Sequence, residues 1–535
     1  MKYIKEHFQT LITVLICMLI IPMLIYIFVG FKSWMNTDSA IVVEYAIEAI
    51  ETHTLLPTTW YNCNDFWVYS LVPLIVVFIK MGFSLFYARQ LSAFIQSIIL
   101  FYVLYELLHN TLKDKEGFKI VVLMLLSGIS GQFIFEVFGD ANYGTIILYM
   151  LFSLLLFVKY QVNFYKKYII ILGIFLSIIT SFSLRFPVYI GAPIICCILY
   201  SIYEKGFKKE QLFSLGTIII SIGVAFLLNL ILRHFLLFVA NYDSIVIVNS
   251  GGNLAENLFC FIYNLFYVSG ATYKNMYGLI YSLDNTFISS NSSPLIVLPF
   301  IKTIFVIFTV SIPIFLFKKV NKMTIEEKNI YIFIVSFTLI LMFFLIMCGM
   351  VWYRYVTIII FYLLLLYPIM YKYYFKKKEK NRVVFYCMIL LFVGVSIFNV
   401  TFSCFKLRDF SFRVNPHKEI TDFLESKGLS FGYVLHVSES NIYSLVSDGK
   451  IHVASIDKEN KKMVEWASSS RWDDEDYYQG KVFVIRRFDQ GEFELEESAS
   501  EHYVLNTPGT DYMISIFDDN KIILDYFKGD KNEEK

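Results

Sequence analysis

The chain has 535 residues, of which 57% are hydrophobic and only 17% are charged, and its formal net charge at pH 7 is +1. One soluble core of this length could not hide so much apolar surface, and the balanced charge leaves no basic excess for binding nucleic acid. The composition therefore predicts a polytopic α-helical membrane protein.

The cysteines and the first apolar run narrow this class further. The eight cysteines fall mostly in apolar runs and show neither a CxxC pair nor a Cys/His grouping, so we expect no zinc site. The first run, from Leu11 to Val29, is long enough to span a membrane and lacks a small-residue cleavage site. We interpret it as a retained first helix and not as a cleaved signal.

Eleven apolar stretches are long enough to cross a bilayer, which takes about 20 residues. In chain order they are residues 9–31, 90–109, 118–137, 144–159, 168–184, 187–203, 212–239, 296–317, 329–348, 353–371 and 383–403. Two further stretches, residues 68–83 and a segment near 254–270, are marginal candidates.

The basic loops decide whether residues 68–83 cross. If they do not, the Lys- and Arg-rich loops after the second, fourth, sixth, eighth and tenth spans all fall on the side of Lys2 and Lys5. The positive-inside rule makes that side cytoplasmic. We therefore predict a re-entrant or interface-lying helix at 68–83, within a first outer loop of residues 32–89 that carries interfacial helices. A second large outer loop is predicted at 240–295.

An odd number of spans places the end of the chain outside. We divide the chain into a membrane module, residues 1–404, and a small extracytoplasmic α/β domain, residues 405–535. In this domain "HKEITDFLESKGLSFGYVLHVSE" predicts an amphipathic helix, a turn at Gly428 and a short strand, and "KVFVIRR" and "DYMISIF" predict further strands. Its four histidines have no metal-ligand spacing.

Acidic residues mark the start of the first outer loop. Asp38 stands a few residues after the first span, and Glu44, Glu48 and Glu51 follow on one stripe of an amphipathic helix. Simple solvation explains the three glutamates, so we expect them to face water. Asp38 precedes the helix and should be pressed between the helix and the bundle, which makes it a candidate functional acid.

A second acidic pair lies at the next outer turn, "FEVFGDANYGT", where Glu136 and Asp140 interrupt two apolar spans. An ionisable side chain at membrane depth costs about 2.5 to 3.5 kcal/mol on insertion scales and is typical of a cavity or a buried partner. Alternatively, Asp140 and its neighbours only end a helix. Both readings stay open at this point.

Basic residues near the outer face are few, and an outer Arg runs against the positive-inside trend. Arg354 and Arg185 at span ends, with Lys80 and Arg89 in the first loop, are candidate binders of a phosphate on a substrate. The alternative is a structural salt bridge to one of the outer acids. For Arg233 and Lys302 we expect snorkelling to the interface.

These features together resemble the GT-C superfamily of integral membrane glycosyltransferases, which includes protein O-mannosyltransferases and the lipid A aminoarabinose transferase. The resemblance rests on an Asp soon after the first span, a second acid at the next outer turn, an "RY" opening a late span, and a C-terminal extracytoplasmic domain. Asp38, Ser39, Ala40, Leu56, Pro57 and Trp60 form the pattern "DSA…LP…W". The chain lacks the "KPP" of the first loop of the aminoarabinose and mannosyl transferases.

The resemblance implies a function as well as a fold. The family moves a sugar from a polyprenyl-phosphate carrier to an acceptor on the outer side of the membrane, here an envelope glycan, lipid or protein. Asp38 would then be the general base or help to hold a divalent cation (Mg or Mn), and Glu136 or Asp140 would be the second acid. Arg354 and Arg185 would bind the donor phosphate, with Lys80 or Arg89 approaching it from the first loop.

Two other classes of function remain as alternatives. A transporter or flippase for a lipid-linked saccharide would need charged or broken helices at mid-membrane, whereas Glu106, Arg233 and Lys302 sit toward span ends. An inactive relative could act as a scaffold in polysaccharide assembly. No nucleotide-binding glycine motif is visible, as expected for a lipid-linked donor.

Overall fold

The computed structural model describes residues 2–33, 35–63, 65–140, 142–239, 254–269, 297–349, 351–406, 415–435, 439–459, 461–507 and 510–529. The chain divides into two compact units. Unit 1 takes its described residues from 1–27, 94–229 and 244–406, and unit 2 takes them from 28–93, 230–243 and 407–535. Unit 2 thus joins the first loop to the C-terminal part of the chain.

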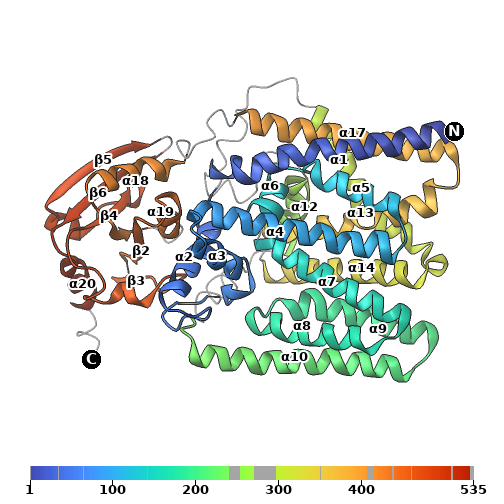
Figure 1. The fold of residues 1–535 in the computed structure, drawn as a ribbon, viewed down its shortest axis with the longest axis horizontal. Helices are drawn as coiled ribbons and strands as arrows, with labels where there is room; N and C mark the ends of the chain where they lie inside the picture. Colours follow the sequence, from blue (N-terminus) through green and yellow to red (C-terminus); the bar gives the residue numbers. More distant parts are fainter. Residues whose placement is uncertain are drawn as a thin grey trace. The chain divides into compact units, whose positions relative to one another are not determined.

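Unit 1 is made of helices whose long members run side by side (Figure 1). They are α1 (Lys2–Phe28), α4 (Leu85–Tyr105), α5 (Lys115–Leu126), α6 (Gly131–Ile134), α7 (Asn142–Asn163), α8 (Lys166–Phe182), α9 (Ala192–Lys205), α10 (Lys209–Phe235), α12 (Leu254–Val268), α13 (Val297–Phe317), α14 (Ile325–Cys348), α15 (Tyr353–Leu364), α16 (Tyr367–Met370) and α17 (Glu379–Lys406). The first parts of α4 and the ends of α1 and α10 belong to unit 2.

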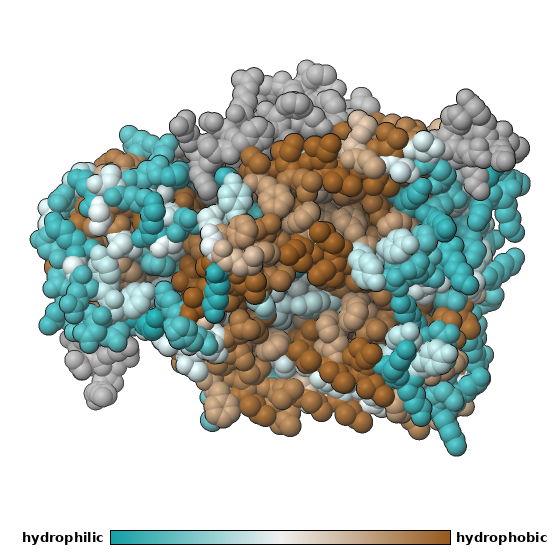
Figure 2. Space-filling view, viewed as in Figure 1, coloured by the Kyte–Doolittle hydropathy of each residue, from teal (hydrophilic) through white to brown (hydrophobic). Residues whose placement is uncertain are grey.

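Each of the eleven predicted spans coincides with helix. Among the described residues, eight helices are long and apolar enough to cross a membrane, and a bent pair raises the number to nine. The two remaining spans are the 17-residue helix α8 and the helix α13. Figure 2 shows hydrophobic side chains gathered over these helices and hydrophilic ones over the C-terminal sheet. The chain is a multi-pass membrane protein.

The predicted span 118–137 is not one straight helix. It is α5 followed by a second helical piece, Gly131–Gly139, and the two are bent by 106° across residues 127–130. Gly128 lies in the left-handed region at φ +66°, a conformation that favours glycine, and the Ser130 hydroxyl accepts a hydrogen bond from the Phe133 amide to start the second piece. The second helical piece therefore carries Glu136 and ends directly before Asp140.

Unit 2 begins with two short helices of the first loop, α2 (Thr37–Glu51) and α3 (Val72–Lys80). Asn36 starts α2, since its side chain accepts a hydrogen bond from the Ser39 amide at 2.9 Å. The segment predicted as an interface-lying helix holds α3. At nine residues it rises about 14 Å, less than half the hydrocarbon thickness, which agrees with a segment that does not cross.

The C-terminal domain is the predicted α/β fold. Its six-stranded sheet has the order β3-β2-β1-β4-β6-β5, with β1 parallel to β2 and β4 and the remaining pairs antiparallel. The strands are β1 (Phe431–Val434), β2 (His452–Asp457), β3 (Lys462–Met463), β4 (Val482–Arg487), β5 (Glu501–Thr507) and β6 (Thr510–Phe517), and the helices are α18 (Pro416–Ser426), α19 (Ser440–Val446) and α20 (Asn520–Gly529). The helix, the turn at Gly428 and the strands β1, β4 and β6 were predicted.

The predicted second outer loop, residues 240–295, lies largely outside the described residues. Its described part, residues 254–269, contains the helix α12, which packs against α14 and α15. Two amide side chains fasten it: Asn257 donates to the Ile346 carbonyl at 2.9 Å and Asn264 donates to the Val351 carbonyl at 2.7 Å. This helix therefore supports the turn from α14 into α15.

Candidate active site

Glu136 lies in a π-helical turn, Phe135–Gly139, at the end of the broken span, and its side chain is fully buried. The Gln132 amide donates to its Oε1 at 2.8 Å, and the Tyr267 hydroxyl of α12 donates to Gln132 Oε1 at 3.2 Å. The extra residue of a π turn re-aims the side chains around it, and such turns occur frequently at functional sites. The break, the π turn and α12 together place one carboxylate inside the helical unit.

Arg354 is the cation of this group. It lies in the first turn of α15, where Gly349 at φ +68° ends α14 and Asn264 holds the intervening turn. Its Nε stands 3.9 Å from Glu136 Oε1, within ion-pair range but too far for a hydrogen bond. We call Glu136, Gln132, Tyr267 and Arg354 the Glu136 cluster.

Arg185 belongs to the same neighbourhood. It lies in the turn between α8 and the π-helical turn Pro187–Gly191 and is half-buried. The charges of Arg354, Arg185 and Glu136 all act on the buried hydroxyl of Tyr143, at the start of α7. The charges of three residues singled out in the sequence therefore reach one tyrosine.

Asp140 follows the π turn directly, and its backbone amide donates to the Phe135 carbonyl at 2.6 Å. Its carboxylate is buried and accepts a hydrogen bond from Asn142 at 3.1 Å. These contacts are those of a residue that ends one helical piece before α7 begins.

Asp38 occupies the first turn of α2 in unit 2 and is half-buried. The backbone amides at a helix N-terminus favour a negative charge at this position. Arg89, on the first part of α4, is fully buried; its Nε donates to the Ser39 carbonyl at 2.8 Å, and its guanidinium lies 4.8 Å from the Phe31 ring centroid. The buried arginine thus holds the backbone next to Asp38.

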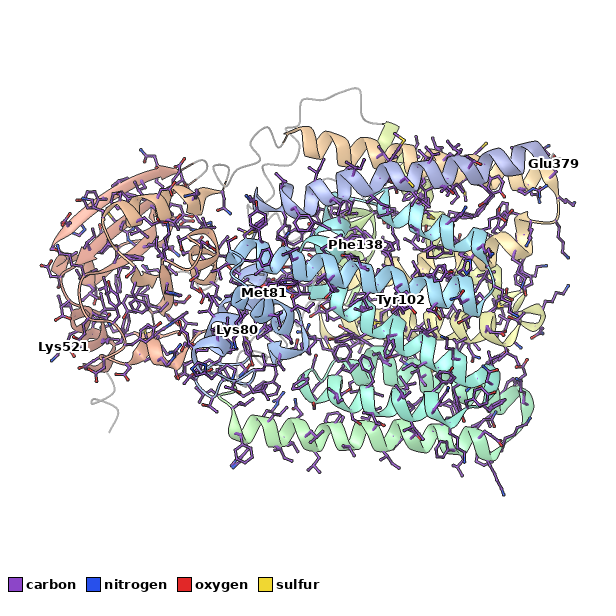
Figure 3. All side chains as sticks on the ribbon, in the orientation of Figure 1. Lys80, Met81, Tyr102, Phe138, Glu379 and Lys521 are labelled. Carbon is purple, nitrogen blue, oxygen red and sulfur yellow. The ribbon has the colours of Figure 1, made fainter. Side chains whose placement is uncertain are left out.

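Lys80 is exposed at the C-terminal end of α3, and Figure 3 labels it beside Met81, which is 65% exposed. The predictions that Lys80 and Arg89 approach a donor phosphate, like those for Arg354 and Arg185, remain predictions. The structure brings Arg354 to Glu136 in unit 1, and it brings Arg89 to the Asp38 helix in unit 2.

Lys302 does not snorkel, and the prediction that it does is wrong. Its side chain is fully buried, its Nζ donates to the Ile129 carbonyl and to the Ser396 hydroxyl at 2.5 Å each, and it lies 4.5 Å from the Phe392 ring centroid. Ile129 lies in the break of the bent pair, where the helix leaves carbonyls without intrahelical partners. A buried ammonium group therefore stabilises the break that precedes Glu136.

The prediction that Glu44 and Glu48 face water is also wrong, because each is only 3% exposed. Arg471 of the C-terminal domain pairs with Glu48 through Nε–Oε1 at 3.0 Å and Nη2–Oε2 at 2.6 Å, and it also reaches the exposed Glu51. His452 Nδ1 lies 3.8 Å from Glu44 Oε2. Burial alone would lower the pKa of His452, but the Glu44 carboxylate outweighs it and the pKa is raised.

Arg471 and His452 carried no signal in the sequence, since both lie amid the mixed charges of a solvated domain. The described residues include no group of three or more His, Cys, Asp or Glu side chains that could hold a metal ion. A divalent cation held with the help of Asp38 therefore stays a prediction.

The chain has the GT-C fold, as the sequence resemblance predicted. No protein-family model matches the chain, and no curated protein matches it by sequence. The assignment therefore rests on the solved structures.

The fold is that of ArnT from Cupriavidus metallidurans. The crystal structure of that protein bound to undecaprenyl phosphate matches with a TM-score of 0.52 and 9% identity, covering 93% of this chain and 97% of that one. Its apo structure matches with a TM-score of 0.51 and 9% identity, covering 95% and 98%. The oligosaccharyltransferase of Archaeoglobus fulgidus, in a complex with Zn and sulfate, matches at 0.45 and 11% identity over 93% of this chain and 72% of that one, a score too low to support an argument.

Proposed function

We propose that this protein is a glycosyltransferase that moves a sugar from a polyprenyl-phosphate carrier to an envelope glycan, lipid or protein acceptor on the outer face of the cytoplasmic membrane. The single observation that supports it most is the full-length likeness to ArnT, one of whose structures holds undecaprenyl phosphate. Because a fold alone does not define an activity, the proposal also depends on the residues at the site. The N-terminus is then cytoplasmic and the C-terminal domain extracytoplasmic.

The chemistry needs a base and a cationic group, and the chain offers both. In the proposed reaction the Asp38 carboxylate takes the proton of the acceptor hydroxyl while the acceptor oxygen bonds to the anomeric carbon of the sugar. The bond from that carbon to the phosphate oxygen breaks, and the electron pair leaves with the polyprenyl phosphate. Arg354 and Arg185, with Lys80 or Arg89, stabilise the negative charge that develops there.

Glu136 has a supporting role in this proposal. A carboxylate that faced the donor phosphate would repel it. In this proposal Glu136 therefore faces Arg354 and orients it. Asp140 is the alternative second acid. Mutation of Glu136 and of Asp140 should therefore have different effects on transfer.

Transfer from a defined donor tests the proposal. The purified full-length protein, reconstituted in liposomes, is given polyprenyl-phosphate-linked sugars and a panel of envelope acceptors, and product is followed by mass spectrometry. Transfer by the wild type and its loss in Asp38→Asn support the proposal. Movement of the intact lipid-linked sugar across the bilayer without transfer, undiminished in Asp38→Asn, would support the transporter alternative and overturn it.

A further inference from the structure

The C-terminal domain holds the helix that carries Asp38. Within unit 2, α19 packs against α2, and the first loop pairs with the segment 467–470 through backbone hydrogen bonds. Tyr61 donates to the Ser468 carbonyl at 2.9 Å and its own carbonyl accepts from Ala467 at 3.1 Å, while Ser470 donates to the Thr59 carbonyl at 2.7 Å. The loop that follows α2 is therefore joined to the domain by an isolated antiparallel β-bridge, Trp60–Ser469, and its flanking backbone hydrogen bonds.

Several hydrogen bonds join the domain to Glu48, near the C-terminal end of α2. Glu48 Oε1 accepts from Arg471 Nε and from the Ser469 hydroxyl, each at 3.0 Å, and also from the Thr59 hydroxyl, while Oε2 accepts from Arg471 Nη2. Glu48 is nearly inaccessible to solvent, so its charge depends on these partners. A bidentate fork fixes direction as well as distance, which a single point charge cannot do.

Two further contacts fix the rest of the helix. His452 meets Glu44 in the middle of α2, and Arg89 donates to the Ser39 carbonyl in its first turn. An α-helix rises 1.5 Å per residue, so Asp38 lies about 15 Å along the axis from Glu48. Because a helix is stiff over that length, a rotation of α2 at Glu48 changes the direction in which Asp38 points.

We propose that Arg471, with Ser469, is a positioning residue for sugar transfer: it sets the orientation of α2 and so of the Asp38 carboxylate. This inference rests on the proposed function and deepens it. The C-terminal domain thereby becomes part of the catalytic apparatus without contacting the reacting atoms.

The domain provides a matched control. Arg486 makes a second bidentate pair, with Glu496, through Nε–Oε1 at 2.6 Å and Nη2–Oε2 at 3.0 Å, and it joins β4 to the short helix Glu494–Ser498. Loss of either pair should weaken the domain. Only loss of the Arg471 pair removes a contact to α2.

The first measurement separates kcat from KM for Arg471→Ala, Arg471→Lys and Arg486→Ala, each normalised to folded protein by its melting curve. A displacement of about 1 Å in a catalytic group can cost about 100-fold in rate. We expect Arg471→Ala to lower kcat by about 10- to 100-fold with both KM values within about twofold of wild type, and Arg486→Ala to retain wild-type kcat. The swap Arg471→Glu with Glu48→Arg should recover part of the loss. Equal kcat values for Arg471→Ala and Arg486→Ala would overturn the proposal.

The second measurement does not need activity. The thiol introduced by Asp38→Cys is titrated with a small alkylating reagent, peptide by peptide, in the Arg471→Ala, Arg471→Lys and Arg486→Ala backgrounds. A several-fold change in its alkylation rate with Arg471→Ala, absent with Arg486→Ala, supports the proposal even if no sugar transfer is found. An unchanged rate in all backgrounds overturns it, whatever the activity of the wild type.

Discussion

Arg354 Nε stands 3.9 Å from Oε1 of Glu136, and this carboxylate has no exposed surface. A buried acid in a membrane protein is costly unless a positive charge is close, so part of the role of Arg354 is to stabilise Glu136. The arginine is itself only partly buried, with 23% of its side chain exposed. The arginine thus holds a carboxylate while part of its own side chain stays exposed.

Replacing Arg354 tests which of these roles dominates. If it binds the donor phosphate, Arg354→Lys should weaken donor use more than acceptor use, and Arg354→Ala should do so severely. A charge-assisted hydrogen bond contributes about 1.5 to 3 kcal/mol, so roughly a 10- to 100-fold change in donor KM or rate is expected. Donor titrations with melting curves alongside check this. Unchanged donor dependence with a lowered melting temperature would make Arg354 a purely structural residue.

Glu136 and Asp140 can be distinguished by neutral replacements of the same size. We expect Glu136→Gln to reduce transfer by about 100-fold, because it removes the partner that orients Arg354. Asp140→Asn should reduce it by less than about tenfold, since Asn also ends helices well and can keep a hydrogen bond with Asn142. Initial rates at saturating donor decide the order. The reverse ranking would make Asp140 the second acid.

Asp38→Asn should abolish transfer without affecting expression or membrane insertion. Asparagine keeps the volume and some hydrogen bonding of aspartate but cannot accept the acceptor proton. The loss should be at least about 100-fold at every pH tested. Ser39→Ala, in the same helical turn, is the control and should remain active. Near-normal rates in Asp38→Asn would remove this residue from catalysis.

Glu439 gives a stability prediction with a defined pH window. Burial raises the pKa of this acid to about 7. Arg487, whose Nη1 stands 3.3 Å away, lowers the pKa, and the negative charge of Asp489 raises it. His417 lies 3.9 Å away. A raised pKa means that the folded chain holds the proton more tightly, so the stabilisation is full below about pH 4.5 and is lost as the pH rises through about 7.

Glu439→Gln carries no charge to bury and should therefore gain stability relative to the wild type as the pH rises. The gain from pH 5 to pH 8 should approach roughly 3 kcal/mol at most, since one pKa unit corresponds to about 1.4 kcal/mol. Thermal midpoints at several pH values measure it. The exposed Glu419→Gln on α18 serves as control and should show no such trend. A difference between Glu439→Gln and wild type that is independent of pH would refute the argument.

The orientation of the chain can be tested at three exposed or half-exposed positions. In intact cells an impermeant thiol reagent should label the thiols introduced by Lys521→Cys and Ser84→Cys but not the one introduced by Glu379→Cys; Lys521 and Glu379 are labelled in Figure 3. Glu379 begins α17 next to a run of lysines, which the positive-inside rule places in the cytoplasm. Labelling of Glu379→Cys alone would mean that the chain has the opposite orientation to the one predicted.

Local patterns in the sequence were sufficient for the membrane helices and for part of the C-terminal domain. Runs of about 20 apolar residues specify membrane helices, and the alternation in "DYMISIF" specifies β6, because both depend on neighbouring residues only. The break at residues 127–130 was missed because apolar composition does not report on backbone direction. A single Gly and two Ser residues there are compatible with a continuous helix.

The site could be predicted only in part. Glu136 and Arg354 stood out because charged residues in apolar runs are rare. Arg471 could not be found, because its importance comes from Glu48, 423 residues earlier in the chain, and the domain around it is full of similar charges. Lys302 was misjudged because its partner is a backbone carbonyl, which every residue has.

The long separation between Glu48 and Arg471 also has a consequence for biogenesis. The segment that pairs with the first loop is synthesised about 423 residues after Glu48. At about 5 to 20 residues per second, the partners of α2 arrive roughly 20 to 85 s after the helix itself. During that interval the buried glutamates of α2 are unpaired and hydrated, so a prematurely terminated chain would insert its spans and yet leave this helix unfinished.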